Sequence, residues 1–166
     1  MRRLRPLRKR LQIRQREKGM KALVQRVSEA SVEIDGEVVS AIGKGYLILF
    51  GVASGDSTER VGHLAGKVLK LRIFEDEDGK TNKSITDVGG SIIVVSQFTL
   101  YADTEHGNRP GFSGAARPDV AIPVYERFVS ELKAALGDDR VGTGRFGADM
   151  KVRLVNDGPV TVELKA

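Results

Sequence analysis

The 166-residue sequence contains no cysteine and no tryptophan. Without cysteine the chain can form no disulfide framework, no thiolate zinc site and no thiol nucleophile. It also lacks a run of about 18 apolar residues, the length needed to cross a bilayer. No short apolar stretch of the kind found in secretory signals follows the basic start. These absences predict a cytoplasmic protein that does not enter a membrane.

Positive charge is concentrated in the first 19 residues. Residues 1–19 hold nine Lys or Arg and one Glu, a net charge of +8, out of whole-chain totals of 27 basic and 22 acidic residues. Residues 20–166 therefore hold 18 basic and 21 acidic residues, a net charge of −3. We predict a basic N-terminal extension over 1–19, disordered or non-native, and a single domain over 20–166. An RNA-binding arm and an organelle transit peptide are alternative interpretations of the extension.

Short strand patterns dominate residues 20–166. Asp35-Gly36 separates two runs rich in alternating apolar residues, which predicts a hairpin. Residues 46–50 and 91–95 are continuous apolar runs, typical of strands buried on both faces. Apolar residues at helical spacing predict two helices, one ending near Leu71 and one over 118–136. The predicted class is α+β, with a mostly antiparallel or mixed sheet and two main helices.

Neither metal nor nucleotide motifs are convincing. His63 and His106 are far apart and have no metal-ligand spacing, so we interpret both as structural or surface residues. Residues 142–147 match G-x-G-x-x-G, but a polar stretch precedes them and a strand pattern follows, which is the wrong context for a dinucleotide site. We expect no metal and no cofactor.

Two short segments are the candidates for a functional site. Ser96-Gln97-Phe98-Thr99-Leu100 directly follows a predicted buried strand, where hydroxyls and backbone amides could hold an ester carbonyl and its oxyanion. The same residues could merely cap the strand end. Asn156-Asp157-Gly158-Pro159 lies between two alternating runs, at 150–155 and 160–164, and taken alone favours a hairpin turn.

Together, these segments and their flanks resemble the D-aminoacyl-tRNA deacylase family, also called D-tyrosyl-tRNA deacylase. The resemblance spans essentially all of residues 20–166 and includes MKALVQRVSEASVEIDGEVV, GYLILFGVASGD, GGSIIVVSQFTLYAD and TGRFGADMKVRLVNDGPVT, in family order. It implies a barrel-like sheet and a homodimer. It also implies hydrolysis of the ester that joins a D-amino acid, or glycine, to tRNA.

The resemblance further implies an active site shared between two subunits. Ser96, Gln97, Phe98 and Thr99 of one subunit would line the scissile ester. Gly158-Pro159 of the other, as a cis peptide, would exclude an L-amino acid. Arg26 and Asn156 would support that element.

Two mechanisms and two other functions stay open. Thr99 could act as nucleophile or position a water, or the ribose 2′-hydroxyl of the tRNA could assist while amides near Phe98 and Thr99 bind the oxyanion. We favour the second, because no base lies near Thr99 in the sequence. The alternative functions are a non-catalytic RNA-binding module and an enamine or imine hydrolase. For tRNA we expect a local basic patch of Lys83, Arg109, Arg117 and Arg145.

Overall fold

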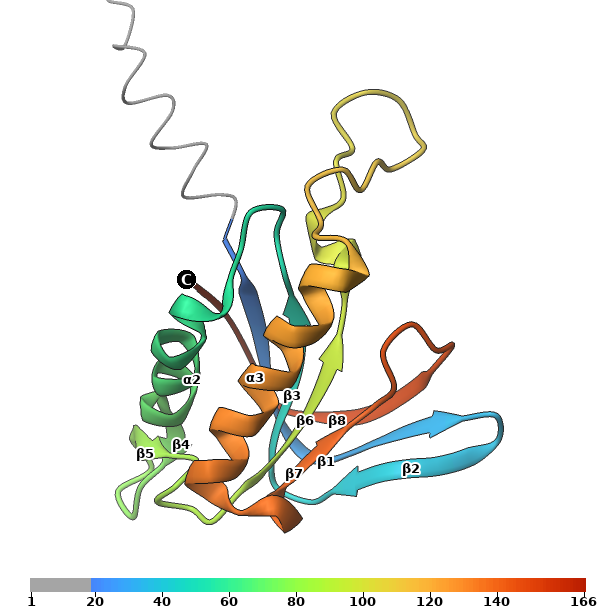
Figure 1. The fold of residues 1–166 in the computed structure, drawn as a ribbon. Helices are drawn as coiled ribbons and strands as arrows, with labels where there is room; N and C mark the ends of the chain where they lie inside the picture. Colours follow the sequence, from blue (N-terminus) through green and yellow to red (C-terminus); the bar gives the residue numbers. More distant parts are fainter. Residues whose placement is uncertain (1–18) are drawn as a thin grey trace, which may run out of the picture.

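The computed structural model describes residues 19–166 (Figure 1). The predicted extension therefore lies outside the described residues, except for Gly19. In chain order the elements are β1 (Lys21–Ile34), β2 (Glu37–Ile42), β3 (Gly45–Gly51), η1 (Thr58–Arg60), α2 (Val61–Lys70), β4 (Arg72–Glu75), β5 (Thr81–Ser84), β6 (Ser91–Ser96), η2 (Phe98–Tyr101), α3 (Pro118–Leu136), η3 (Asp138–Arg140), β7 (Val141–Thr143) and β8 (Lys151–Lys165).

The main sheet is built around β1. Its strand order is β2-β1-β3-β6-β7, and β8 also pairs with β1. The first half of β1 pairs with β3 and its second half with β2, while β8 runs antiparallel to nearly its whole length. The pairs β3–β6 and β6–β7 are parallel. The sheet is thus mixed and strongly bent (Figure 1), and the predicted α+β class with two main helices is confirmed.

Both predicted apolar strands are buried on both faces, as expected. Alternate residues of β3 point to opposite sides, so Tyr46, Ile48 and Phe50 join one cluster while Leu47 joins the other. The first cluster lies under α2 and α3, which cover one face of the sheet (Figure 1). In this cluster the ring of Phe50 stacks on that of Phe128 from α3, with centroids 4.4 Å apart.

Local signals also placed the hairpin and the second helix correctly. Asp35 and Gly36 have φ of 51° and 81°, the paired positive values of a type I′ turn. α3 begins at Pro118, where a missing N–H costs nothing, and its last turn closes with the Gly137 amide donating to the Lys133 carbonyl at 2.8 Å. Pro123 lies inside α3, which continues through it.

The predicted turn at residues 156–159 is wrong. β8 is one strand of 15 residues, and both of its halves pair with the 14-residue β1. Gln25 pairs with Thr161 and Val27 with Asn156, so the single residue Arg26 faces four residues of β8. The segment 157–160 is therefore an enlarged bulge within a continuous strand, because a long partner strand holds both sides of it.

Candidate functional site

Residues 96–99 lie where β6 leaves the sheet. The amide of Gln97 donates to the Phe50 carbonyl at 2.8 Å, and the chain then turns into the short helix η2. The side-chain amide of Gln97 donates to the hydroxyl of Thr99. Thr99 is exposed, and the Phe98 ring is 55% exposed although it is a large apolar group. The segment thus presents a hydroxyl, an amide and a ring to solvent.

Backbone donors are also available in this segment. The amides of Phe98 and Thr99 open η2, and the first amides of a helix have no partner within it. Neither amide donates a hydrogen bond to any group within residues 19–166. Two free N–H groups next to an exposed hydroxyl can bind a carbonyl oxygen on which negative charge develops.

The bulge of β8 forms the second candidate element. The Gly158-Pro159 peptide is cis, and the four residues 156–159 are exposed. Gly158 has φ +125°, and a Cβ placed there would lie 2.9 Å from the side chain of Val160 and 3.0 Å from Nη2 of Arg26. Only glycine fits this backbone without displacing its neighbours.

Arg26 connects the bulge to the rest of the fold. It is the one buried charged residue within 19–166, with 8% of its surface exposed. Its Nε donates to the Asp157 carbonyl at 2.9 Å, and its Nη1 donates to the Ile73 carbonyl in β4. The carboxylate of Asp157 lies 3.9 Å from Nε, and 56% of that side chain is exposed. One guanidinium thus joins the backbones of β8 and β4.

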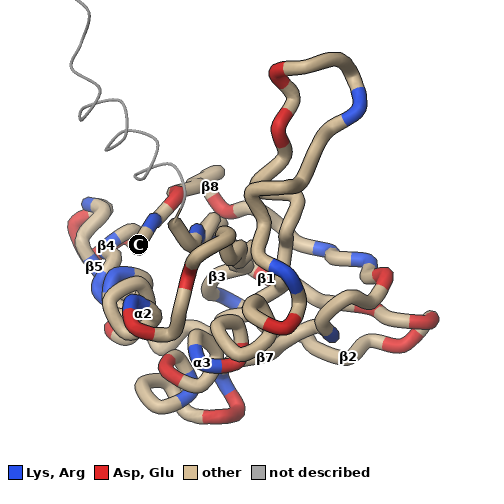
Figure 2. Tube along the Cα trace, turned by 45° about the horizontal axis from the view of Figure 1, so that its top comes forward, with Lys and Arg blue, Asp and Glu red and all other residues tan. Residues whose placement is uncertain are grey.

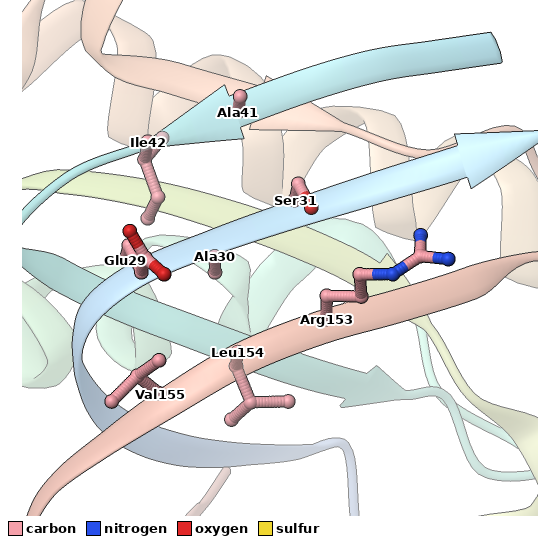
Figure 3. Close-up of a pocket in the computed structure, with 8 residues that line it drawn as sticks. All are labelled: Glu29, Ala30, Ser31, Ala41, Ile42, Arg153, Leu154 and Val155. Atoms are coloured by element: carbon pink, nitrogen blue, oxygen red, sulfur yellow. The ribbon is translucent and has the colours of Figure 1, made fainter.

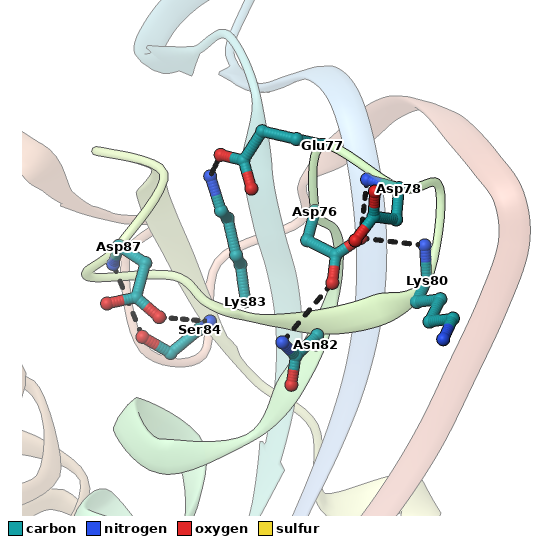
Figure 4. A network of polar contacts seen from close by, with 8 residues as sticks. All are labelled: Asp76, Glu77, Asp78, Lys80, Asn82, Lys83, Ser84 and Asp87. Atoms are coloured by element: carbon teal, nitrogen blue, oxygen red, sulfur yellow. Dashed lines mark hydrogen bonds and ion pairs between the residues drawn. The ribbon is translucent and has the colours of Figure 1, made fainter.

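The β4–β5 hairpin that supplies the Ile73 carbonyl is held by its own polar network (Figure 4). Asp76 accepts from the amides of Lys80 and Asp78, each at 2.9 Å, and from the side chain of Asn82 at 3.2 Å. The Lys80 amide, followed by the other donors, lowers the pKa of Asp76. The carboxylate therefore stays ionised to a lower pH than an ordinary aspartate, and its accepted hydrogen bonds fix the turn.

Tyr46 lies beside Arg26 in the sheet. The two residues pair across β1 and β3, and the Tyr46 ring stacks on Phe74 of β4 with centroids 5.3 Å apart. Burial raises the pKa of the Tyr46 phenol, and the charge of Arg26 opposes this only partly. The hydroxyl has no hydrogen-bond partner within the described residues.

One copy of the chain does not bring the two segments together. Ser96 lies level with Phe50 in β3, which faces Ala22 in β1, which faces Leu164 in β8. The bulge faces Arg26, four residues further along β1. The two segments are thus three strand spacings of about 4.8 Å apart across the sheet and four residues of about 3.3 Å apart along it. The distance between Ser96 and the bulge is therefore on the order of 20 Å.

A hollow next to the bulge is lined by none of the residues 96–99. It has a volume of about 300 Å³ and lies between β1, β2 and β8 (Figure 3). Its lining is Glu29, Ala30, Ser31, Ala41, Ile42, Arg153, Leu154 and Val155. Val155 directly precedes Asn156, so the hollow borders one candidate element and contains nothing of the other.

The four predicted basic residues do not form one patch. Lys83 lies in β5 and Arg109 in the long loop before α3, at opposite ends of the molecule (Figures 1 and 2). Lys83 is paired with Glu77, and Arg117 lies 4.0 Å from Asp119. Sequence spacing alone could not reveal this separation. His63 and His106 are both exposed and lie on different elements.

One residue beside the candidate site was not predicted. Phe112 contacts Phe98 edge-on, with ring centroids 5.1 Å apart and planes at 77°. The available signal was that Phe112 is the only Phe, Tyr or Trp between residues 102 and 117.

No helix within 19–166 is long and apolar enough to span a membrane.

Comparison with known proteins supports one family. The family model described as D-Tyr-tRNA(Tyr) deacylase matches residues 23–165. A D-aminoacyl-tRNA deacylase of Bacteroides thetaiotaomicron is 55% identical over 143 residues, covering 86% of this chain and 95% of that protein. One of Roseiflexus castenholzii is 57% identical over 145 residues, covering 87% and 91%.

Two solved structures share the fold of this chain. The c-Myc DNA Unwinding Element Binding Protein superposes with a TM-score of 0.83 at 43% identity, covering 88% of this chain and 98% of that one. A second, titled as a probable eukaryotic D-amino acid tRNA deacylase, has a TM-score of 0.78 at 19% identity, covers 89% and 99%, and supports the fold alone. The family match, the close relatives and the shared fold together place this chain in the D-Tyr-tRNA(Tyr) deacylase family.

Proposed function

We propose that this protein hydrolyses the ester bond of D-aminoacyl-tRNA and releases the D-amino acid and free tRNA. The observation that carries this proposal is the identity of about 55% to D-aminoacyl-tRNA deacylases over most of the chain. The proposed setting is the cytoplasm. Glycyl-tRNA is a second proposed substrate, because glycine has no side chain for a chirality filter to exclude.

The active site is proposed to form between two copies of the chain. The support is geometric: the ester-binding segment 96–99 and the bulge at 157–160 are on the order of 20 Å apart in one copy. In a two-fold dimer, a contact between the bulge of one copy and segment 96–99 of its partner occurs twice. Each bulge can therefore complete the partner's site.

Complementation tests this arrangement. Gln97→Ala and Gly158→Ala each damage one half of the site, so each purified variant should be inactive. If the halves come from different copies, co-refolding equal amounts restores one intact site in each mixed dimer, about a quarter of wild-type activity for a statistical two-fold mixture. A mixture as inactive as its components would place the site within one chain.

The proposed filter is the backbone of Gly158 and Pro159, braced by Arg26 and Asn156. To exclude the L-enantiomer, a site needs a rigid surface that clashes with its side chain more than it needs an attractive pocket for the D-enantiomer. The bulge meets this requirement because Arg26 and Val160 pack tightly against Gly158. The wall offers backbone rather than a specific side-chain pocket, so many D-amino acids should be accepted.

The proposed chemistry begins with attack of a water molecule on the ester carbonyl. The amides of Phe98 and Thr99 stabilise the oxyanion, the bond to the ribose 3′-oxygen breaks, and that oxygen takes up a proton released by the attacking water, whose oxygen stays in the carboxylate of the amino acid. Thr99 is poorly suited as a nucleophile. Its hydroxyl accepts a hydrogen bond from the side-chain amide of Gln97, and an amide cannot serve as a base. The neighbouring 2′-hydroxyl of the ribose is the better candidate to guide the water.

Two assays test the reaction and its mechanism. Purified protein is given D-tyrosyl-tRNA, L-tyrosyl-tRNA and glycyl-tRNA, and release of amino acid is expected from the first and third. Equal inertness toward all three, with salt-sensitive tRNA binding, would favour the RNA-binding alternative. For the mechanism, loss of activity in Thr99→Ala together with full activity on a 2′-deoxy ester would refute the role of the 2′-hydroxyl.

A further inference from the structure

The Phe98 ring is held by a single aromatic contact from a distant loop. Residues 102–117 rise away from the sheet and return before α3 (Figure 1). On the return, Phe112 meets Phe98 with centroids 5.1 Å apart and planes at 77°, the edge-to-face geometry that aromatic pairs prefer. Neither ring belongs to the two hydrophobic clusters of the core. The contact is therefore local to the proposed site.

The loop holds Phe112 from both sides. Before it, Asp103 and Gly111 exchange two backbone hydrogen bonds, of 2.7 and 2.9 Å. After it, the Ser54 amide donates to the Gly114 carbonyl, and the Ala116 amide donates to the Val52 carbonyl, both at 2.9 Å. These bonds tie the return of the loop to the segment that follows β3. The position of Phe112 is thus set by backbone contacts that do not involve Phe98.

Phe98 needs such a support because its own surroundings leave it loose. Its ring is 55% exposed and projects from η2, which has only four residues. Phe98 itself carries one of the two free amides proposed to hold the ester, and Thr99, the next residue, carries the other. A change of the Phe98 rotamer would alter the wall of that site without disturbing the core.

We propose that Phe112 is a positioning residue that fixes the rotamer of Phe98 and so shapes the wall of the ester site. This inference rests on the proposed deacylase activity for its kinetic consequence. The physical contact can be tested without that activity. Because the contact acts on the shape of the reacting site and not on tRNA binding, its loss should lower kcat and leave KM unchanged.

The kinetic test compares Phe112→Leu with Phe112→Tyr. Leu fills most of the volume without a ring, and it should reduce kcat for D-tyrosyl-tRNA by about twofold to about tenfold, the range expected from one edge-to-face pair. Tyr keeps the ring and should restore kcat. Val120→Ala is the matched control, since Val120 is also a partly exposed apolar residue, at 38%, and lies in the first turn of α3 just after the loop. Unchanged kcat in Phe112→Leu, or equal loss in both Phe112 variants, would overturn the proposal.

A second measurement separates this inference from the proposed function. The protein is labelled with ¹⁹F-phenylalanine, and the Phe98 resonance is identified by its disappearance in Phe98→Leu. We expect that resonance to shift in Phe112→Leu and to stay in place in Val120→Ala, with the melting temperature of both close to wild type. A shift in a protein that releases no amino acid would support the contact and refute the function. A Phe98 resonance unmoved by Phe112→Leu would refute the contact.

Discussion

Replacing Arg26 by methionine should weaken the fold and disable the proposed filter together. Arg26→Met keeps much of the side-chain volume but removes both donors, the one to the Asp157 carbonyl at 2.9 Å and the one to the Ile73 carbonyl. Hydrogen bonds that involve a charged group contribute about 1.5–3 kcal/mol each. Part of this is regained, because methionine has no charge to bury.

The two partners left behind differ in exposure. The Asp157 side chain is 56% exposed, so that residue can turn to water when the guanidinium is lost, whereas the Ile73 carbonyl loses its donor in a buried position. No buried charge is stranded, which limits the cost. We therefore expect a loss of about 2–3 kcal/mol in the free energy of unfolding. For a chain of this size that lowers the melting temperature by about 5–10 °C.

Two further variants make the result specific. Arg127→Met removes an exposed helix ion pair, at 3.0 Å to Glu131, and should change stability by about 0.5 kcal/mol or less. Arg26→Lys keeps the charge, but an ammonium cannot span two carbonyls as a guanidinium fork does. It should recover part of the stability and little of the preference for D- over L-tyrosyl-tRNA.

Thermal and urea unfolding at one fixed protomer concentration provide the stability values, because association would otherwise change them. Release of tyrosine from both tRNA esters provides the selectivity. If Arg26→Met matches the wild type in melting temperature and in selectivity, Arg26 does not brace the bulge.

Four other changes to the chain have definite expected outcomes. Tyr46→Phe removes a buried hydroxyl without a partner in the described residues, so stability in urea should be unchanged or higher by about 1 kcal/mol, and a loss of that size would indicate a hidden partner. Gly66→Ala places a methyl in open space on α2 and should raise the unfolding free energy by about 0.5–1 kcal/mol. Gly45→Ala, in contrast, would put its Cβ 1.7 Å from the Ser91 carbonyl oxygen and should yield no folded protein. A chain of residues 20–166, the proposed domain, should keep its deacylase kcat and lose mainly salt-sensitive tRNA affinity; a folded but inactive truncation would make the extension part of the active protein.

Local sequence signals were sufficient where neighbours along the chain decide the structure. Asp35-Gly36 predicted its hairpin, because both residues accept the positive φ that a type I′ turn requires. Pro118 and Gly137 marked the two ends of α3 for similar backbone reasons. The apolar run 46–50 predicted a strand buried on both faces, because no polar residue in it could face water.

The same local signals misled at residues 156–159. Asn, Asp, Gly and Pro all favour turns, yet β8 passes straight through them as a bulged strand. The deciding factor is β1, which is more than 120 residues away in the sequence and long enough to pair on both sides of the bulge. Turn propensity amounts to little against a ladder of hydrogen bonds on either side.

By itself, the sequence determined which segments carry polar groups at strand ends and which family pattern they follow. Only the tertiary structure decided that Arg26 is buried opposite the bulge, that Phe112 reaches Phe98, and that residues 96–99 and 157–160 stay apart in one copy. These relations depend on the register between strands and loops that are distant in sequence. Register follows from the burial of whole faces of the sheet and not from the preference of any single residue.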